Sequence, residues 1–167
     1  MSDANVATSG RGAEVFAAIR RLFEEAGIEY RTLHHEPTLT SEDSARARGE
    51  PLSVGAKALL LKVDERFGLF VLPADRKLDS AAIKKQFGAK KSRFATPDEL
   101  LSATGLVPGS VPPFGEPILP FELWADVAVG AEHGRVAFNA GLLTDSIIVA
   151  TADWERAARP QRFAFSG

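Results

Sequence analysis

A lysine within an apolar segment is the first residue of this chain whose type and position suggest chemistry. Lys57 lies in the stretch Gly55-Ala-Lys57-Ala-Leu-Leu-Leu61. If this stretch is a strand, its side chains alternate between two faces, and Lys57 shares a face with Leu59 and Leu61. An amine at the rim of an apolar pocket is partly desolvated, which strengthens its attraction for a carbonyl or phosphate oxygen. Alternatively, Lys57 begins the strand and its ammonium extends into water, and spacing alone favours this alternative.

A second candidate is the segment 105–117, GLVPGSVPPFGEP, which is rich in glycine, proline and serine. Glycines let a ligand approach backbone N–H groups closely, and prolines restrict a loop's conformations in advance. Such a loop can act as a preorganised cradle for a carbonyl oxygen or a phosphate. A rigid connector would have the same composition, so the pattern alone leaves both interpretations open.

A third candidate is a basic stretch. Between Arg76 and Arg93 the chain carries seven lysines and arginines against one acid, Asp79. Such a cluster is either a solvated helix face or a surface that contacts nucleic-acid phosphates. The second interpretation predicts a phosphate-contacting group formed by Lys84, Lys85, Lys90, Lys91 and Arg93. The net charge of −2 and the pI near 5.9 add no general bias toward nucleic acid.

The usual catalytic patterns are incomplete. The sequence has no G-x-S-x-G elbow, no H-E-x-x-H and no full Walker loop. Its three histidines, His34, His35 and His133, do not have a metal-ligand spacing, and it has no cysteine. We therefore expect neither a metal nor a cofactor.

The elements that would hold these candidates alternate between helices and strands. Residues 13–26 have helical apolar spacing, while 56–63 and 67–72 are apolar strands separated by a short turn, which predicts a hairpin. Asp79 and the Thr96-Pro-Asp-Glu99 sequence are capping signals for helices that end near 87 and 104. Shorter patterns predict strands at 29–33, 123–129, 135–139 and 146–151 and helices at 40–49 and 153–158.

Composition is that of one globular domain. The chain has 167 residues, 45% of them hydrophobic and 25% charged. We expect a loose tail over residues 1–12 and a single domain over 13–167. No apolar run approaches the roughly 18 residues of a membrane span, and residues 1–11 lack the apolar segment of a signal peptide. We therefore expect a cytoplasmic protein without membrane contact.

Four segments together resemble one family. They are GAKALLLKV, VLPADRKLD, FGAKKSRFATPDELLSATGLVPGSVPPFG and RVAFNAG. Their order and spacing, over roughly residues 13–151, are similar to the YbaK/ProX family of prolyl-tRNA editing deacylases. This family is related to the editing domain inserted in many bacterial prolyl-tRNA synthetases. Its characteristic lysine matches Lys57, and its G-x-x-x-P loop matches Gly109-Ser-Val-Pro-Pro113.

The resemblance implies a fold and an activity. The fold would be a single mixed α/β (α+β) domain, with a curved mixed β-sheet surrounded by helices. The activity would be hydrolysis, in trans, of the ester that joins a small wrong amino acid to tRNA, with tRNA(Pro) as the expected partner. In this family the substrate's own ribose hydroxyl is thought to assist the attacking water, while the lysine and the loop backbone position the ester. A transient association with an aminoacyl-tRNA synthetase is a further expectation.

The resemblance also implies the site residues. Lys57 and Gly109 would be catalytic, and the substrate-binding residues would be Ser110, Val111, Pro112, Pro113, Phe114, Gly115 and Asn139. The assignment of the basic stretch to tRNA is our own.

The chain departs from the family's pattern at three places. Ser110 stands where YbaK-like members often have a second glycine, and Pro112 where they often have serine. The segment Phe138-Asn-Ala-Gly141 lacks the histidine of the alanine-specific branch, so alanine is not assigned as the amino acid.

Two other classes of function remain open. One is a non-catalytic tRNA- or nucleic-acid-binding module of the same fold. The other is a small-molecule-binding domain with no RNA partner.

Overall fold

The computed structural model describes residues 3–167, with side chains described from residue 11 onward. Its helices and strands follow one another along nearly the whole chain. In order they are α1 (Asp3–Glu25), β1 (Arg31–His34), α2 (Ser41–Arg48), the short 3-10 helix η1 (Leu52–Val54), β2 (Ala56–Val63), β3 (Arg66–Pro73), α3 (Ser80–Phe87), β4 (Ser92–Phe94), α4 (Pro97–Thr104), β5 (Leu123–Asp126), β6 (Arg135–Leu142), β7 (Asp145–Ala150), α5 (Thr151–Ala158) and β8 (Gln161–Phe163).

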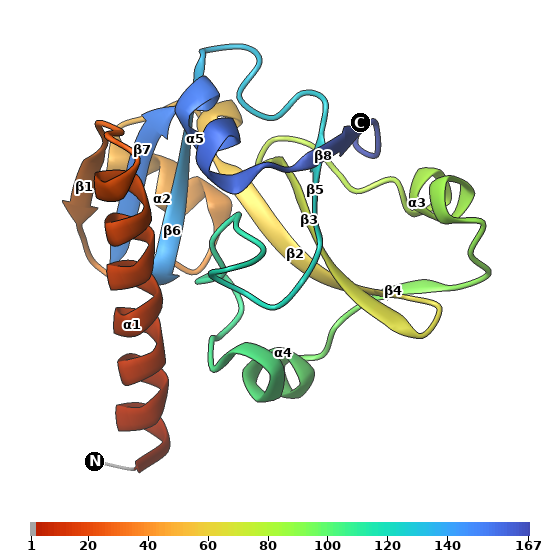
Figure 1. Ribbon diagram of the computed structural model, residues 1–167, viewed down its shortest axis with the longest axis horizontal. Coiled ribbons are helices and arrows are strands. Elements are labelled where there is room, and N and C mark those ends of the chain that lie inside the picture. The colour runs from red at the N-terminus through yellow and green to blue at the C-terminus, as the bar shows by residue number, and fades with distance from the viewer. Residues whose placement is uncertain (1–2) are drawn as a thin grey trace.

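The strands form two sheets (Figure 1). In the five-stranded sheet, of order β4-β2-β3-β5-β8, the predicted hairpin β2–β3 pairs without a shift from Ala56 opposite Pro73 to Val63 opposite Arg66. β5 and β8 add to this hairpin in parallel, which makes the sheet mixed. The three-stranded sheet, of order β1-β7-β6, is antiparallel throughout.

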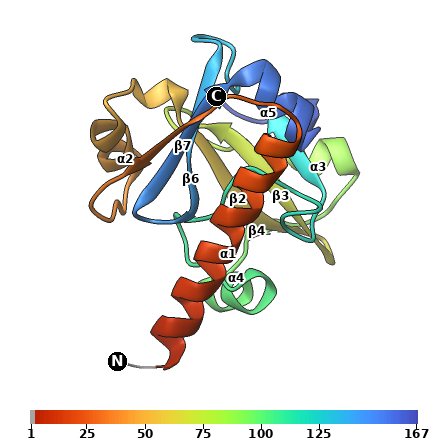
Figure 2. The ribbon, with the colours of Figure 1, turned by 60° about the vertical axis from the view of Figure 1, so that its left-hand side comes forward.

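The two sheets meet where β2 begins. Gly55 forms an isolated parallel bridge with Ala137 of β6, which brings the first residues of β2 beside the three-stranded sheet. Helix α1 packs against β6 and crosses the front of the molecule in Figure 2. A Cβ atom at Gly12 would lie 2.5 Å from the carbonyl oxygen of Gly141, so this close helix–strand contact requires glycine.

The five-stranded sheet is covered on both faces. Leu60 of β2 belongs to the main core, whereas the next residue, Leu61, lies in a second cluster with Phe70, Leu72 and Ile83 of α3. Burial on both faces explains why β2 and β3 are nearly continuous apolar runs in the sequence.

Three predicted helix starts, at Thr40, Asp79 and Thr96, are confirmed. The Asp79 carboxylate accepts a hydrogen bond from the backbone N–H of Ala82 at 3.1 Å, as an N-cap does. Thr96 and Glu99 form both halves of a capping box at the start of α4. Thr40 likewise caps α2 through the N–H of Asp43.

The fold class is confirmed, and the structure corrects its details. The strands form two sheets rather than one, and the consecutive strands β5 and β6 belong to different sheets. Strands β4 and β8, which we did not predict, have three residues each, too few for a period-2 pattern. Residues 3–12, expected as a loose tail, are helical; residues 1–2 lie outside the described residues. No proline interrupts this stretch, so α1 continues through it.

None of the helices in residues 3–167 combines the length and the apolarity that a membrane crossing requires.

The pH dependence of stability provides a test of the α4 capping box. Two hydrogen bonds from Arg93, together with the capping bonds at Thr96, lower the pKa of Glu99 from its ordinary value of 4.5 to about 2. A depressed carboxyl pKa adds stability above the ordinary pKa, and this contribution is lost as the pH falls from about 4.5 to about 2. Glu99→Gln should therefore melt at a slightly lower temperature than the parent at pH 7. Melting temperatures measured from pH 7 to pH 2 should converge at the acid end, and a constant difference would contradict this account.

Candidate active site

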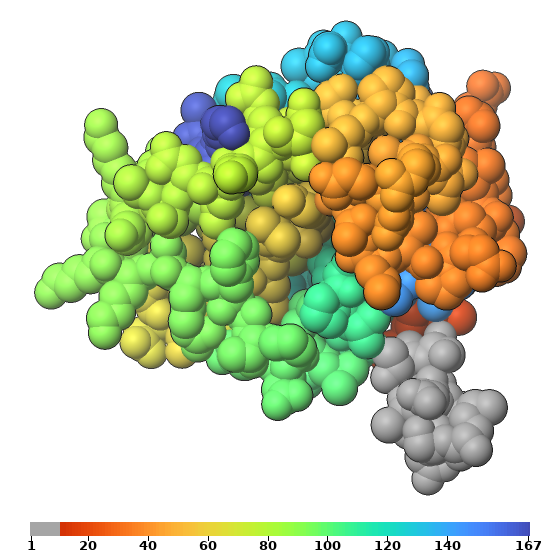
Figure 3. Space-filling model, turned by 180° about the vertical axis from the view of Figure 1, so that it is seen from behind, coloured from red at the N-terminus to blue at the C-terminus, as the bar shows by residue number. Residues whose placement is uncertain are grey.

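A small cavity opens where the two sheets meet. It encloses about 170 Å³ and is lined by the β1–α2 connection, by α2, by the start of β2, by the loop at Gly109 and by β6. Figure 3 shows the hollow between the orange residues of the β1–α2 segment and the green and teal residues that follow β3. The cavity is smaller than the roughly 300–1,000 Å³ of pockets for drug-sized ligands, so it suits a group of a few atoms.

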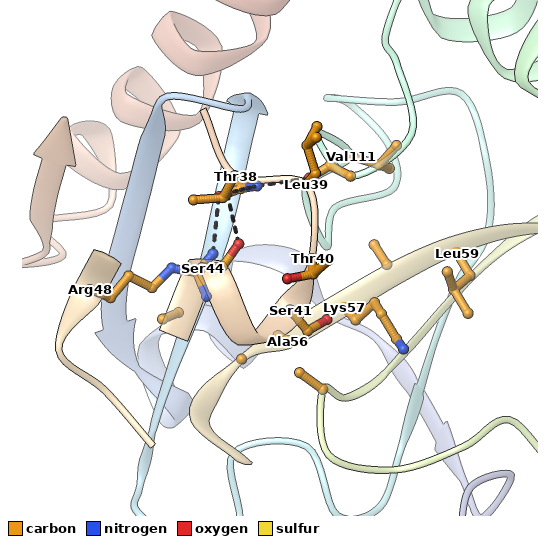
Figure 4. Close-up of a pocket in the computed structure, with 16 residues that line it drawn as sticks. Thr38, Leu39, Thr40, Ser41, Ser44, Arg48, Ala56, Lys57, Leu59 and Val111 are labelled. Atoms are coloured by element: carbon orange, nitrogen blue, oxygen red, sulfur yellow. Dashed lines mark hydrogen bonds between the residues drawn. The ribbon is translucent and has the colours of Figure 1, made fainter. Parts of the chain in front are cut away.

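Lys57 lies in the wall of this cavity, on the strand β2 (Figure 4). Its side chain is half-buried, and within the described part of the chain it forms no ion pair with a carboxylate. The predicted alternation is confirmed, because Leu59 and Leu61 pack in the second cluster, whereas Leu60 packs in the main core. The ammonium of Lys57 is thus available to an oxygen atom that enters the cavity.

A second cation, Arg48 at the end of α2, lines the opposite part of the cavity (Figure 4). Its Nε donates to the Ser146 hydroxyl at 2.9 Å, and its Nη2 donates to the Asn139 side-chain oxygen at 3.1 Å. Burial lowers the pKa of Arg48 to about 10, and the nearby Glu50 carboxylate opposes this change. Arg48 therefore remains charged at neutral pH while it is held by neutral acceptors.

Asn139 links Arg48 to the glycine-rich loop. Its Nδ2 donates to the carbonyl oxygen of Gly109 at 2.9 Å, and this carbonyl can only accept. Gly109 has a φ of +88°, a conformation that residues with side chains rarely adopt. The backbone N–H of Gly141 also donates to the carbonyl of Ser110 at 2.9 Å, so β6 holds the loop at two consecutive residues.

Hydroxyl groups form the polar end of the cavity. Ser44 donates to Thr38 Oγ1 at 2.8 Å, and Asn139 Nδ2 approaches the same oxygen at 3.5 Å. Behind them, His35 Nε2 lies 2.8 Å from the Ser146 hydroxyl. The side chains of Thr38 and Ser44 are both buried.

Of the nine residues predicted to be catalytic or to bind substrate, four line the cavity, namely Lys57, Gly109, Val111 and Asn139. The other five, Ser110, Pro112, Pro113, Phe114 and Gly115, are buried and do not line it. The Phe114 ring packs between Phe23 and Phe138, and the Pro113 carbonyl accepts a hydrogen bond from the Trp154 indole at 3.0 Å. This buried part of the loop therefore anchors the loop to the core.

The basic stretch lies on α3, on β4 and on the turn between them, at the end of the molecule away from α1 and α2 (Figure 1). Lys85, Lys90 and Lys91 are exposed, and Lys84 is half-buried at the end of α3. Arg93 differs from the lysines, because both of its terminal nitrogens bond to the Glu99 carboxylate at 2.8 and 3.0 Å. The sequence interpretation overlooked this neutralising acid, which follows Arg93 by six residues.

Sequence analysis missed most of the polar network. Arg48 and Ser146 are 98 residues apart, and no local pattern joins them. One signal was present: Ser44 and Arg48 are four residues apart, so a helix over 41–48 places them on one face.

Comparison with known proteins defines the class to which this fold and cavity belong. Residues 35–157 match the model of the aminoacyl-tRNA editing domain, and this range contains all four predicted residues that line the cavity. A solved structure described as a candidate trans-editing enzyme for prolyl tRNA synthetase superposes with a TM-score of 0.78. It is 20% identical, and the alignment covers 92% of this chain and 97% of that one.

Two sequence relatives place the chain more closely. The multifunctional Ser/Thr-tRNA deacylase ProXp-y of Escherichia coli K12 is 33% identical over 160 residues, which cover 93% of this chain and 95% of the relative. A proline–tRNA ligase of Shouchella clausii is 32% identical over 60% of this chain, which corresponds to 17% of the ligase. The chain belongs to the aminoacyl-tRNA editing domain family. The predicted family and enzyme class, an aminoacyl-tRNA deacylase, are thereby confirmed.

Substitution of Gly109 tests the loop. A Cβ atom there would lie 3.3 Å from Leu143 Cδ2, and the positive φ strains a β-branched residue by about 1–3 kcal/mol. Gly109→Val should therefore lower the rate of aminoacyl-tRNA hydrolysis about tenfold or more. Ser110→Ala removes a hydroxyl that donates to the Val107 carbonyl and accepts from the Val107 N–H, both within the loop, and should change this rate less than about threefold.

The matched control is Gly88→Val. Gly88 has a similarly positive φ of +60°, but it ends α3 and has no atom within 4 Å of its Cβ position. This control should lower the melting temperature and leave turnover of the folded protein intact. Full activity of Gly109→Val would show that the loop is only a connector.

Proposed function

We propose that this chain is a trans-acting deacylase that hydrolyses the ester between tRNA(Pro) and a small wrong amino acid. The observation that carries the proposal is the position of Lys57 in a 170 Å³ cavity beside the Gly109 loop. In this arrangement the ammonium attracts the ester carbonyl or the adjacent phosphate. The loop, held by Asn139 and Gly141, fixes the space in which the ester lies.

The lining of the cavity supports catalysis by orientation and electrostatics. Among the described residues that line it, none is aspartate, glutamate or histidine, the side chains that most often act as general bases. Water activation by the ribose hydroxyl of the substrate, which the family resemblance implies, fits a cavity of this composition. The protein's share of the reaction is then to hold the ester and to stabilise the negative charge that develops on its oxygen.

The size and polarity of the cavity support a small polar amino acid. The volume excludes large side chains, and four hydroxyl residues, Thr38, Thr40, Ser41 and Ser44, contribute to the lining. The similar E. coli protein is a Ser/Thr-tRNA deacylase. We therefore propose seryl and threonyl esters as the preferred substrates. The tRNA(Pro) partner is supported by the similarity to part of a proline–tRNA ligase.

A group of exposed and half-buried lysines supports a tRNA contact. Lys84 and Lys85 lie at the end of α3, and Lys90 and Lys91 lie in the turn before β4, at the end of the molecule away from α1 and α2 (Figure 1). We propose that these lysines contact phosphates of the acceptor stem, and that Arg93 contributes less because its charge is paired with Glu99.

Lys57→Ala tests the mechanism. Loss of an electrostatic group at the reacting ester costs about 100- to 1,000-fold, and we expect a decrease in kcat/KM of this size for deacylation of mischarged tRNA(Pro). The matched control is Lys62→Ala, because Lys62 lies on the same strand but outside the cavity, over the Phe67 ring. The assay is deacylation of a panel of tRNAs charged with serine, threonine, alanine and cysteine. Near-normal turnover by Lys57→Ala would remove Lys57 from the mechanism. Tight tRNA binding by the parent with no hydrolysis of any ester would favour a binding module.

Two double variants test the tRNA contact. Each phosphate contact releases condensed counterions, so Lys84→Ala/Lys85→Ala and Lys90→Ala/Lys91→Ala should raise KM. They should also reduce the slope of log KM against log salt by roughly one unit per lost contact, with kcat nearly unchanged. Arg20→Ala/Arg21→Ala makes the same change in charge on α1 and serves as the control. If the lysine variants and this control show equal slopes, tRNA docks elsewhere.

A further inference from the structure

The polar end of the cavity contains a chain of hydrogen bonds that starts from a group able only to donate. It begins at Arg48, whose guanidinium can only donate. The two oxygens that face it, Ser146 Oγ and Asn139 Oδ1, must therefore accept. This requirement fixes the orientation of the Asn139 amide, with its oxygen toward Arg48 and its nitrogen toward the Gly109 carbonyl, which can only accept.

The same orientation points the Asn139 nitrogen at Thr38. Thr38 Oγ1 thus receives an N–H from Asn139 at 3.5 Å and the hydroxyl hydrogen of Ser44 at 2.8 Å. In a pair of hydroxyls one hydrogen forms the bond and the other is left over. With Ser44 as the donor, Ser44 and Asn139 occupy both lone pairs of the Thr38 oxygen. Among the residues that the structure describes, Thr38 Oγ1 donates no hydrogen bond in return. Its own hydrogen is left for whatever occupies the cavity, which Thr38 lines.

Two other hydroxyls of the lining, those of Thr40 and Ser44, are used differently. Thr40 is exposed at the rim, and its oxygen caps α2 by accepting from Asp43. Ser44 donates its hydroxyl hydrogen to Thr38. Thr38 is only 6% exposed, and a buried donor without an acceptor is destabilising. An occupant that brings an acceptor oxygen to this point is therefore favoured over one that does not.

We propose that Thr38 is the residue that recognises the side-chain hydroxyl of the aminoacyl group, by donating a hydrogen bond to its oxygen. Arg48 is a positioning residue in this assignment, since it orients Asn139 and thereby leaves the Thr38 hydrogen free for the substrate. The assignment rests on the proposed deacylase function and names the group that selects a hydroxylated amino acid. A methyl side chain, as in alanine, offers the Thr38 hydroxyl no acceptor.

The experiment compares seryl and alanyl esters of the same tRNA(Pro), so that tRNA contacts are constant. Thr38→Val keeps the shape of the side chain and removes the hydroxyl. It should lower kcat/KM for the seryl ester about 10- to 100-fold and change that for the alanyl ester less than about threefold. Thr38→Ser keeps the hydroxyl and should restore most of the preference for serine. Ser41→Ala, which removes another hydroxyl from the same lining, should leave the ratio of the two kcat/KM values unchanged.

A double-mutant cycle tests the role of Arg48. Arg48→Lys should reduce the seryl-to-alanyl ratio in the parent and should reduce it no further in Thr38→Val, because both changes remove the same interaction. A purely structural role would instead lower turnover of both esters equally in either background.

The outcomes separate this assignment from the function on which it rests. If the parent hydrolyses neither ester, the proposed function is wrong and the role of Thr38 falls with it. If the parent is active and folded Thr38→Val keeps the parental ratio, Thr38 does not recognise the hydroxyl, while the deacylase function stands. A changed ratio in Ser41→Ala with none in Thr38→Val would also overturn the assignment.

Discussion

The guanidinium of Arg48 is a positive charge held away from bulk water, and the geometry of the cavity depends on it. Taking such a charge out of water costs several kcal/mol unless it is well hydrogen-bonded. Here Asn139 of β6 and Ser146 of β7 supply acceptors, and Glu50 opposes the effect of burial without touching the guanidinium. Glu50 is itself held by Arg135 at 2.7 Å. Because the Arg48 guanidinium can only donate, its hydrogen bonds join α2 to the three-stranded sheet and determine which atoms face the cavity.

The cavity depends equally on the contact between the two sheets, because residues of both sheets line it. Lys57 belongs to the five-stranded sheet and Asn139 to the three-stranded sheet, and the bridge between Gly55 and Ala137 sets their separation. A Cβ atom at Gly55 would lie 3.0 Å from Ala74 Cβ and 3.7 Å from Arg48 Nη1. The first distance is tight and the second is an ordinary van der Waals contact, so packing against Ala74 favours glycine here although its φ is ordinary.

Sequence analysis succeeded where the information is local. The caps at Asp79 and Thr96 and the β2–β3 hairpin follow from residues a few positions apart. The parallel pairing of β5 with β3, and the bonds from Arg48 to residues more than 90 positions away, leave no periodic signal. The glycine-rich loop shows both limits: the family resemblance assigned Gly109 to the site, and Gly109 lines the cavity, but the sequence did not distinguish the cavity side from the anchor formed by Pro113 and Phe114.

The charges of the cavity suggest how binding and catalysis are divided. Lys57 and Arg48 both line it, and no carboxylate does so among the described residues. An aminoacyl ester carries an α-ammonium group in the ground state, which two cations do not favour. In the proposed mechanism, negative charge develops on the ester oxygen in the transition state, and the ammonium of Lys57 stabilises it. The proposed role of Lys57 is therefore stronger in the transition state than in the bound substrate, which is the condition for an interaction to raise the rate rather than only the affinity.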